Sequence, residues 1–154
     1  MALSSMYESE KKWRVRFMEL ADHVATWSKD PSTKVGAVIT AGKEILSLGY
    51  NGFAPRTPDH DSYLENREEK YPRIIHAETN AILRLHRGYR PLLPMTIYVT
   101  HMPCANCASL IIAAGITEVV TRKPPEELLR RWPHMEKSFE LFHEARIKVS
   151  FAEV

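Results

Sequence analysis

The chain has 154 residues, which is enough for one domain with a sizeable buried core. Its 21 basic and 19 acidic side chains leave a formal net charge of +2, which argues against a nucleic acid as the partner. No apolar run approaches the ~20 residues that cross a bilayer, and the charged N-terminus lacks the apolar stretch of a secretory signal, so we expect a cytoplasmic protein without membrane contact.

The first half of the chain predicts a helix, a hairpin and a long loop. Apolar residues three or four positions apart, from Trp13 to Trp27, predict an amphipathic helix over about 4–28. Strand-like runs at 35–40 and 44–50 flank a turn and predict an antiparallel hairpin. Residues 51–72 are rich in proline, glycine and charge, so we expect a surface loop with one helical turn near 62–70.

In the second half, helices alternate with single strands. We expect helices at 76–86 and 103–114, then a helix from Pro124 that breaks near Trp132-Pro133 and resumes to 145, with strands at 96–100, 118–121 and 147–151. A helix between two strands carries the chain back across a sheet, which favours parallel neighbours. The predicted fold class is α/β, a three-layer α-β-α sandwich around a mixed five-stranded sheet.

Two fragments carry the chemistry of the sequence. They are His76-Ala77-Glu78 and Pro103-Cys104-Ala105-Asn106-Cys107, which holds both cysteines of the chain. A hydrolytic zinc uses three protein ligands and keeps one position open, and one histidine with two thiolates supplies three. Cys104 and Cys107 are three positions apart and share one face of a helix, whose N-terminus favours thiolates. The metal ligands are therefore predicted to be His76, Cys104 and Cys107.

Glu78 is the predicted catalytic residue. It lies two positions after His76, so on a helix it does not point along the same direction as that ligand. Zinc lowers the pKa of water towards neutrality, and a carboxylate can then move protons between water and substrate. In nucleobase deamination, hydroxide attacks carbon 4 of cytosine, and the carboxylate protonates the ring nitrogen and the departing ammonia.

Other interpretations of each fragment alone are a structural zinc ribbon or a thioredoxin-like pair for the cysteines, and chance for His-x-Glu. A structural site needs a fourth ligand, and the chain has no second cysteine pair. Together, the fragments match the zinc-deaminase signature H-x-E…P-C-x-x-C.

Beyond these two fragments, the sequence resembles the cytidine and deoxycytidylate deaminase family, specifically its deoxycytidylate (dCMP) branch, over about 27–149. The resemblance is carried by these segments: S-K-D-P-S-T-K-V-G-A-V-I (28–39), G-Y-N-G-F (49–53), H-A-E-T-N-A-I (76–82), Y-V-T-H-M-P-C-A-N-C-A (98–108) and S-F-E-L-F (138–142). It implies one deaminase domain over 1–154, one catalytic zinc ion per subunit, a homo-oligomer, and conversion of the small nucleotide dCMP to dUMP with release of ammonia.

The resemblance also implies a set of substrate-binding residues. Asn51 matches the asparagine with which the family contacts the nucleoside. Ser28, Lys29 and Thr33 match the segment beside the nucleotide pocket, and Ala77 belongs to the segment that carries His76 and Glu78.

One loop departs from the family pattern. Where relatives carry Gly-Phe-Pro-Arg-Gly, this chain has Gly52-Phe53-Ala54-Pro55-Arg56-Thr57, which speaks against allosteric control by dCTP or dTTP although Arg56 remains available to a phosphate. The alternatives to dCMP are 5-methyl-dCMP, cytidine, guanine or tRNA adenosine, and a zinc-binding module without turnover.

Overall fold

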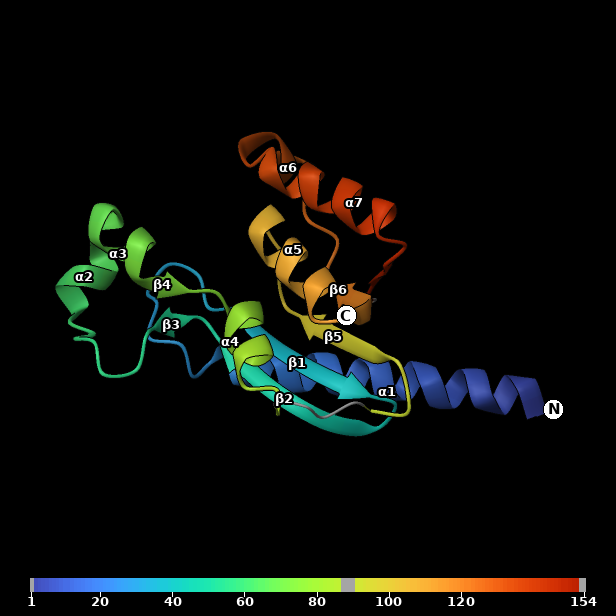
Figure 1. Cartoon of the computed structure of the whole chain (residues 1–154). Helices are drawn as coiled ribbons and strands as arrows, with labels where there is room; N and C mark the ends of the chain where they lie inside the picture. The colour runs from blue at the N-terminus through green and yellow to red at the C-terminus, as the bar shows by residue number, and fades with distance from the viewer. Residues whose placement is uncertain (1, 87–90, 153–154) are drawn as a thin grey trace.

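The computed structural model describes residues 2–86 and 91–152 (Figure 1). Its helices are α1 (Ala2–Ala25), α2 (Asp61–Glu65), α3 (Arg67–Arg73), α4 (Ala77–Leu83), α5 (Ala105–Ala113), α6 (Glu126–Arg131) and α7 (His134–Glu144). Its strands are β1 (Gly36–Ala41), β2 (Glu44–Tyr50), β3 (Gly52–Phe53), β4 (Ile74–Ile75), β5 (Met95–Val99), β6 (Ile116–Thr121) and β7 (Lys148–Phe151). No helix in these ranges is long and apolar enough to cross a membrane.

The predicted fold class is confirmed. Five strands form one sheet in the order β2-β1-β5-β6-β7. The hairpin β1–β2 and the pair β1–β5 are antiparallel, whereas β5–β6 and β6–β7 are parallel, as the alternation of helix and strand predicts. Helix α1 covers one face of the sheet, and α4, α5 and α7 cover the other (Figure 1).

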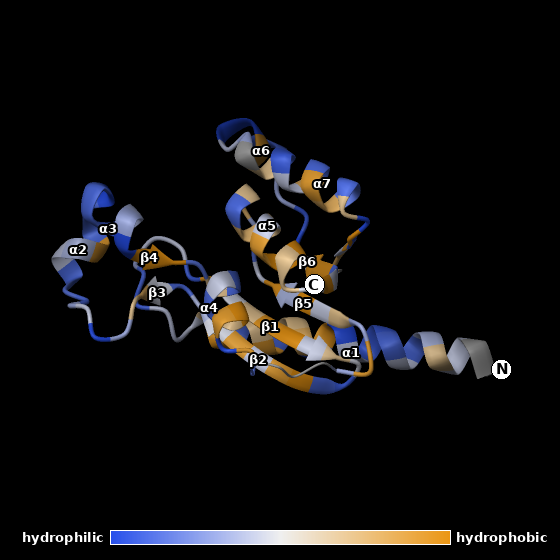
Figure 2. Ribbon diagram, viewed as in Figure 1, coloured by the Kyte–Doolittle hydropathy of each residue, from blue (hydrophilic) through white to orange (hydrophobic). Residues whose placement is uncertain are grey.

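Two apolar cores hold the layers together, one on each face of the sheet. The core under α1 contains Phe17, Met18 and Tyr98, while the core under α4 and α5 contains Ile97, Ile111 and other aliphatic side chains. Figure 2 shows the apolar colour concentrated in the sheet and its facing helices, whereas α2 and α3 are largely hydrophilic. The hydrophobic effect therefore stabilises the sandwich rather than the segment that contains α2 and α3.

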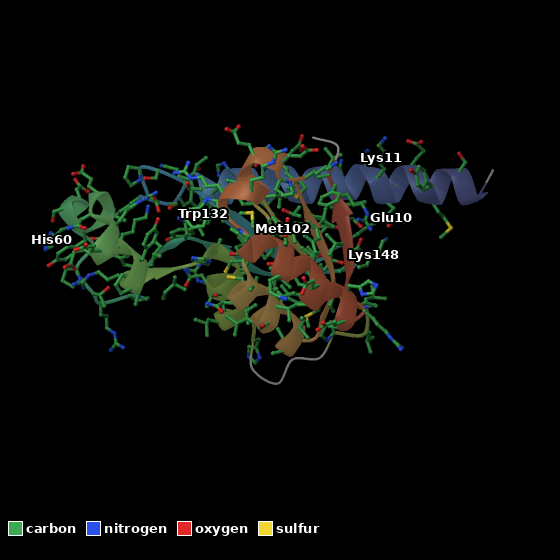
Figure 3. The ribbon with its side chains drawn as sticks, turned by 90° about the horizontal axis from the view of Figure 1, so that it is seen from above. Glu10, Lys11, His60, Met102, Trp132 and Lys148 are labelled. Atoms are coloured by element: carbon green, nitrogen blue, oxygen red, sulfur yellow. The ribbon has the colours of Figure 1, made fainter. Side chains whose placement is uncertain are left out.

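Residues 52–75 leave the sandwich as an excursion between β2 and α4 (Figure 1). The sequence predicts one helical turn here, but the structure has two short helices, α2 and α3, and a two-stranded ladder in which Gly52 faces Ile75 and Phe53 faces Ile74. The figure seen from above places His60 towards the outer end of the excursion, and Glu10, Lys11 and Lys148 towards the opposite end of the molecule (Figure 3).

Helix boundaries differ from the sequence-based expectation at both ends of the chain by only a few residues. Helix α1 ends at Ala25, three residues before the expected Ser28, whose hydroxyl donates to the carbonyl of Asn51 instead. The break at Trp132-Pro133 between α6 and α7 is confirmed. Trp132 is 40% exposed, so it is not a core residue.

A glycine lets α4 lie directly on β2. A Cβ atom on Gly49 would stand 2.2 Å from the carbonyl oxygen of Ala77 and 2.4 Å from the amide nitrogen of Ala81, both of which are backbone atoms of α4. Any side chain at this position would displace the helix.

We therefore expect Gly49→Ala to destabilise the fold by about 3 kcal/mol, the upper end of the usual cost of overpacking. Gly52→Ala is the matched control, because its Cβ would meet its nearest neighbour, the ring of Tyr50, at an ordinary 4.0 Å. We expect that control to change the free energy of unfolding by less than about 1 kcal/mol. Urea unfolding of both variants measures the difference, and equal stabilities would contradict the close approach.

Candidate metal centre

Two helix starts converge at one end of the sheet. His76 is the N-cap residue of α4, directly after β4, and Cys104 is the N-cap residue of α5, after β5 and a short turn. Cys107 lies in the first turn of α5, so both thiols face the positive end of that helix dipole. The sequence thus places the three predicted ligands on two elements whose first turns adjoin.

The three side chains form a cluster whose ligand atoms all lie within 4.8 Å of one another. The Nδ1 atom of His76 is 3.6 Å from Cys104 Sγ and 3.4 Å from Cys107 Sγ. Tetrahedral zinc, with bonds of about 2.3 Å to sulfur and about 2.0 Å to nitrogen, separates such atoms by about 3.5 Å. The cluster therefore fits zinc without rearrangement, and its three donors leave a fourth position for water.

The two thiols influence each other strongly. Their mutual hydrogen bond lowers the pKa of Cys104 and raises the pKa of Cys107. The hydrogen bond to Cys104 also raises the pKa of His76. Thr79 brings its hydroxyl to 3.8 Å from Cys107 Sγ. One negative charge is therefore readily formed on this pair, and a dication is the partner that would stabilise a second.

Glu78 lies beside the cluster without belonging to it. Its residue is only 4% exposed, in the first turn of α4, and burial raises the pKa of its carboxyl group. A buried carboxyl group with a raised pKa gains and loses a proton more readily near neutrality than an exposed one. The position and environment of Glu78 suit a group that transfers protons.

Asn51 precedes Gly52 and His76 follows Ile75, and Gly52 and Ile75 pair in the ladder between β3 and β4. Asn51 and His76 therefore lie at the same end of this ladder. The side chain of Asn51 is buried and occupied by protein contacts. Its Oδ1 accepts from the amide of Val35 at 2.8 Å, and its Nδ2 donates to the carbonyl of Thr33 at 2.9 Å and to Asp30 at 3.3 Å. Asn51 therefore adjoins the metal cluster, and its role towards a nucleoside stays a prediction.

The other predicted substrate residues differ in placement. Ser28 is buried and holds the carbonyl of Asn51 at 2.8 Å. Ala77 is the first residue of α4 and is fully buried. The exposed side chain of Lys29 forms an ion pair with Asp59, and Thr33 is an exposed residue whose backbone binds Asp30 and Asn51. The structure brings His76, Glu78 and the two cysteines into one group, with Asn51 adjoining. Ser28 and Thr33 are joined to Asn51 by hydrogen bonds, whereas the side chain of Lys29 is paired with Asp59.

Two charged residues near this group were not predicted from the sequence. Asp30 lies in the segment before β1 and binds Lys70 of α3. A signal for Asp30 exists, because Asp-Pro-Ser-Thr favours a turn in which the carboxylate accepts backbone N–H groups two and three residues on, as Ser32 and Thr33 do here. No sequence signal points to Lys70, whose partner is distant along the chain.

Known solved structures share the fold. The dCMP deaminase of cyanophage S-TIM5 superposes with a TM-score of 0.69 at 21% identity, covering 90% of this chain and 95% of that one. A diaminohydroxyphosphoribosylaminopyrimidine deaminase/reductase of Thermotoga maritima superposes with a TM-score of 0.65 at 25% identity, covering 93% of this chain and 37% of that one.

The chain is similar in sequence to proteins named as deaminases. An uncharacterised deaminase from the luxG 3′ region of Aliivibrio fischeri is 43% identical, over 91% of this chain and 93% of its own length. The deoxycytidylate deaminase of Mus musculus is 38% identical over 71% of this chain, and the alignment spans 64% of the mouse protein. The family described as the cytidine and deoxycytidylate deaminase zinc-binding region matches residues 11–123. With that match and the His-Cys-Cys cluster at its centre, the chain belongs to the cytidine and deoxycytidylate deaminase family.

Proposed function

We propose that the protein deaminates dCMP to dUMP and ammonia as a single deaminase domain, with one catalytic zinc ion per subunit held by His76, Cys104 and Cys107. The observation that carries this proposal is the three-ligand cluster with the buried carboxyl group of Glu78 beside it. The choice of dCMP is supported by the 38% identity to the mouse protein named deoxycytidylate deaminase.

In this reaction, Glu78 moves the protons. Zinc in the cluster would supply Lewis-acid activation of a water molecule near neutral pH. Glu78 accepts a proton from the attacking water and delivers it to the ring nitrogen N3. It then accepts the remaining proton of that water from the new hydroxyl on carbon 4 and delivers it to the amine, which leaves as ammonia while the carbon 4 oxygen becomes the carbonyl of dUMP. Water and dCMP are consumed, dUMP and ammonia are formed, and the carboxyl group returns to its starting state.

We propose that Asn51 orients the nucleoside beside His76. Among the described residues, its Oδ1 accepts one hydrogen bond, from Val35, and an amide oxygen can accept two. A sugar hydroxyl could therefore donate to Asn51 while its protein contacts remain. We further propose that the substrate pocket is lined by Ser28, Lys29, Thr33 and Ala77. Lys29 is the one cation in this set.

An ammonia-release assay across several substrates tests the proposal. We expect dCMP to give the highest kcat/KM among dCMP, 5-methyl-dCMP, CMP, dCTP, deoxycytidine, guanine and a tRNA anticodon stem-loop. Deoxycytidine should fall by about 10-fold or more, since a hydrogen bond to a charged group contributes about 1.5–3 kcal/mol. Turnover of guanine or tRNA with inert dCMP would overturn the substrate assignment, and no turnover of any substrate by the zinc-loaded protein would overturn the function.

The homo-oligomer implied by the resemblance stays a prediction. Exposed apolar side chains on α4 and α5 are groups that a subunit contact would bury. They include Leu83, which is 71% exposed on α4, and Leu110, which is 41% exposed on α5.

A further inference from the structure

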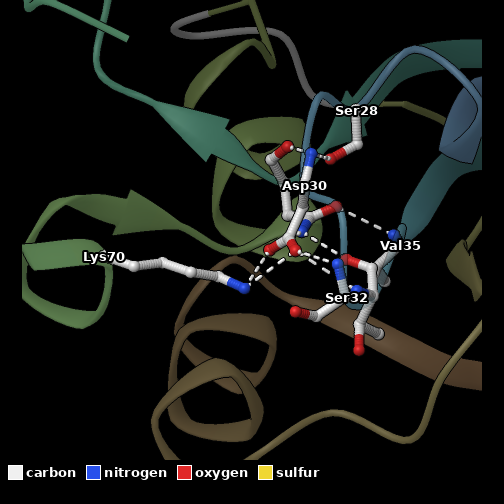
Figure 4. A network of polar contacts seen from close by, with 7 residues as sticks. Ser28, Asp30, Ser32, Val35 and Lys70 are labelled. Atoms are coloured by element: carbon white, nitrogen blue, oxygen red, sulfur yellow. Dashed lines mark hydrogen bonds and ion pairs between the residues drawn. The ribbon is translucent and has the colours of Figure 1, made fainter. Parts of the chain in front are cut away.

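The carboxylate of Asp30 is the centre of a buried polar network (Figure 4). Asp30 is 3% exposed, and its Oδ1 accepts from the amides of Ser32 at 2.8 Å and Thr33 at 3.2 Å. Lys70 contacts both carboxylate oxygens, at 2.8 Å and 2.7 Å, and Asn51 donates to Oδ2 at 3.3 Å. The segment before β1, the end of β2 and helix α3 therefore meet at one anion.

Two routes from this network lead to His76, one through a pair of the β3–β4 ladder and one along the chain. On one route, Asn51 is followed by Gly52, which pairs with Ile75, the residue before His76. On the other route, Lys70 lies in the last turn of α3, which continues through β4 into His76. Asp30 thus binds Asn51, which directly precedes β3, and Lys70, which lies in the helix that leads into β4. His76 directly follows β4.

The ion pair between Asp30 and Lys70 is more deeply buried than the pair that Arg73 and Glu69 form on the same helix. Lys70 and Asp30 expose 12% and 3% of their side chains, whereas Arg73 and Glu69 on the same helix expose 39% and 44%. Exposed pairs contribute little because water and salt screen them, while removing one partner of a buried pair leaves an uncompensated charge. Burial raises the pKa of Asp30, but Lys70 and the two amides outweigh it and hold the pKa below its ordinary value.

We propose that Asp30 and Lys70 are a positioning ion pair for the metal centre, which fixes the ladder β3–β4 and thereby the place of His76 opposite Cys104 and Cys107. Neither residue belongs to the cluster of metal ligands. Without the pair, α3 is released from the segment before β1, and His76 loses the support that keeps its ring directed at the two thiols. The kinetic part of this inference rests on the proposed dCMP deamination, whereas the metal-binding part does not.

The variants Asp30→Asn and Lys70→Met test the pair in the full chain. Zinc affinity is measured by competition with a chromophoric chelator, and the cobalt(II)-loaded proteins report the ligand geometry through their visible absorption. We expect both variants to bind zinc about 10-fold more weakly or worse, the usual cost of losing a residue that supports a metal ligand, with altered cobalt bands. Lys70→Arg should keep the zinc affinity close to that of the wild-type protein, because arginine keeps the positive charge opposite Asp30.

Two further comparisons make the outcome decisive. Glu69→Gln removes an exposed charge from the same helix and should leave zinc affinity and the cobalt spectrum unchanged. The double variant Asp30→Asn/Lys70→Met should bind zinc no more weakly than the worse single variant, since the two residues act as one unit. With dCMP, the single variants should lose kcat more than they raise KM.

Unchanged zinc affinity and cobalt bands in folded Lys70→Met would overturn the proposal, and this variant decides the matter if Asp30→Asn does not fold. A weakening by Glu69→Gln equal to that by Lys70→Met would also overturn it, because the effect would then come from α3 in general. Should wild-type protein fail to deaminate dCMP, the proposed function fails, while the zinc and cobalt measurements still judge the ion pair.

Discussion

Glu78→Gln is expected to lower kcat/KM for dCMP by at least about 10²–10⁴-fold, the range that a general acid–base contributes, while zinc stays bound. This corresponds to about 3–5 kcal/mol of lost transition-state stabilisation. Glutamine keeps the size of the side chain in its buried position, but it cannot take a proton from water or pass one to the base. Glu78 is outside the cluster of possible ligands, so the metal should be unaffected.

The measurement pairs ammonia release with the zinc content per chain. Glu118→Gln is the matched control, because the side chain of Glu118 is also a poorly exposed carboxylate, at 15% exposure. Glu118 lies on β6 and pairs with Arg14 at 2.8 Å, outside the metal cluster. We expect that control to lose stability and to keep both zinc and kcat/KM. A wild-type rate in Glu78→Gln would refute the proton-transfer role, and loss of zinc from it would make Glu78 a ligand.

The sandwich and the ligand cluster could be predicted because their signals are local. Helical spacing, the turn between β1 and β2, and alternation of helix with strand are each read within a few residues, and together they define the sheet. His-x-Glu and Pro-Cys-x-x-Cys likewise carry their geometry in their spacing, since each opens a helix.

The excursion could not be predicted in the same way. The strands β3 and β4 have two residues each, too few for a periodic pattern, and they pair across two intervening helices. The contact between Asp30 and Lys70 joins residues 40 positions apart, and nothing in either local sequence specifies the other. The contacts of the Asn51 amide with Asp30 and Thr33 could not be predicted either, because a buried amide takes the partners that the tertiary fold supplies.

Cys107→Ser is expected to weaken zinc binding by more than about 100-fold. Loss of a residue that only hydrogen-bonds to a metal ligand costs about 10–100-fold, whereas this substitution removes a ligand atom itself. Cys107 is 2% exposed and its Sγ lies 3.4 Å from His76 Nδ1, and the other two side chains of the cluster already serve as ligands, so neither can replace it. A serine hydroxyl stays protonated at neutral pH and is a poor ligand for zinc beside a thiolate. Deaminase activity should fall together with the zinc content.

The thermal stability of the same variant separates metal loss from unfolding. A bound ligand stabilises the folded state by about 4.1 kcal/mol when its free concentration is about 1,000 times the Kd, so removing zinc with a chelator should lower the Tm of the wild-type protein. In Cys107→Ser the chelator should have little effect. Met102→Leu also replaces a buried sulfur, at 5% exposure, and should keep the wild-type response to chelator because it changes no cluster atom. A Tm that falls equally in all three proteins would show that zinc is bound without Cys107, and the ligand set would then be wrong.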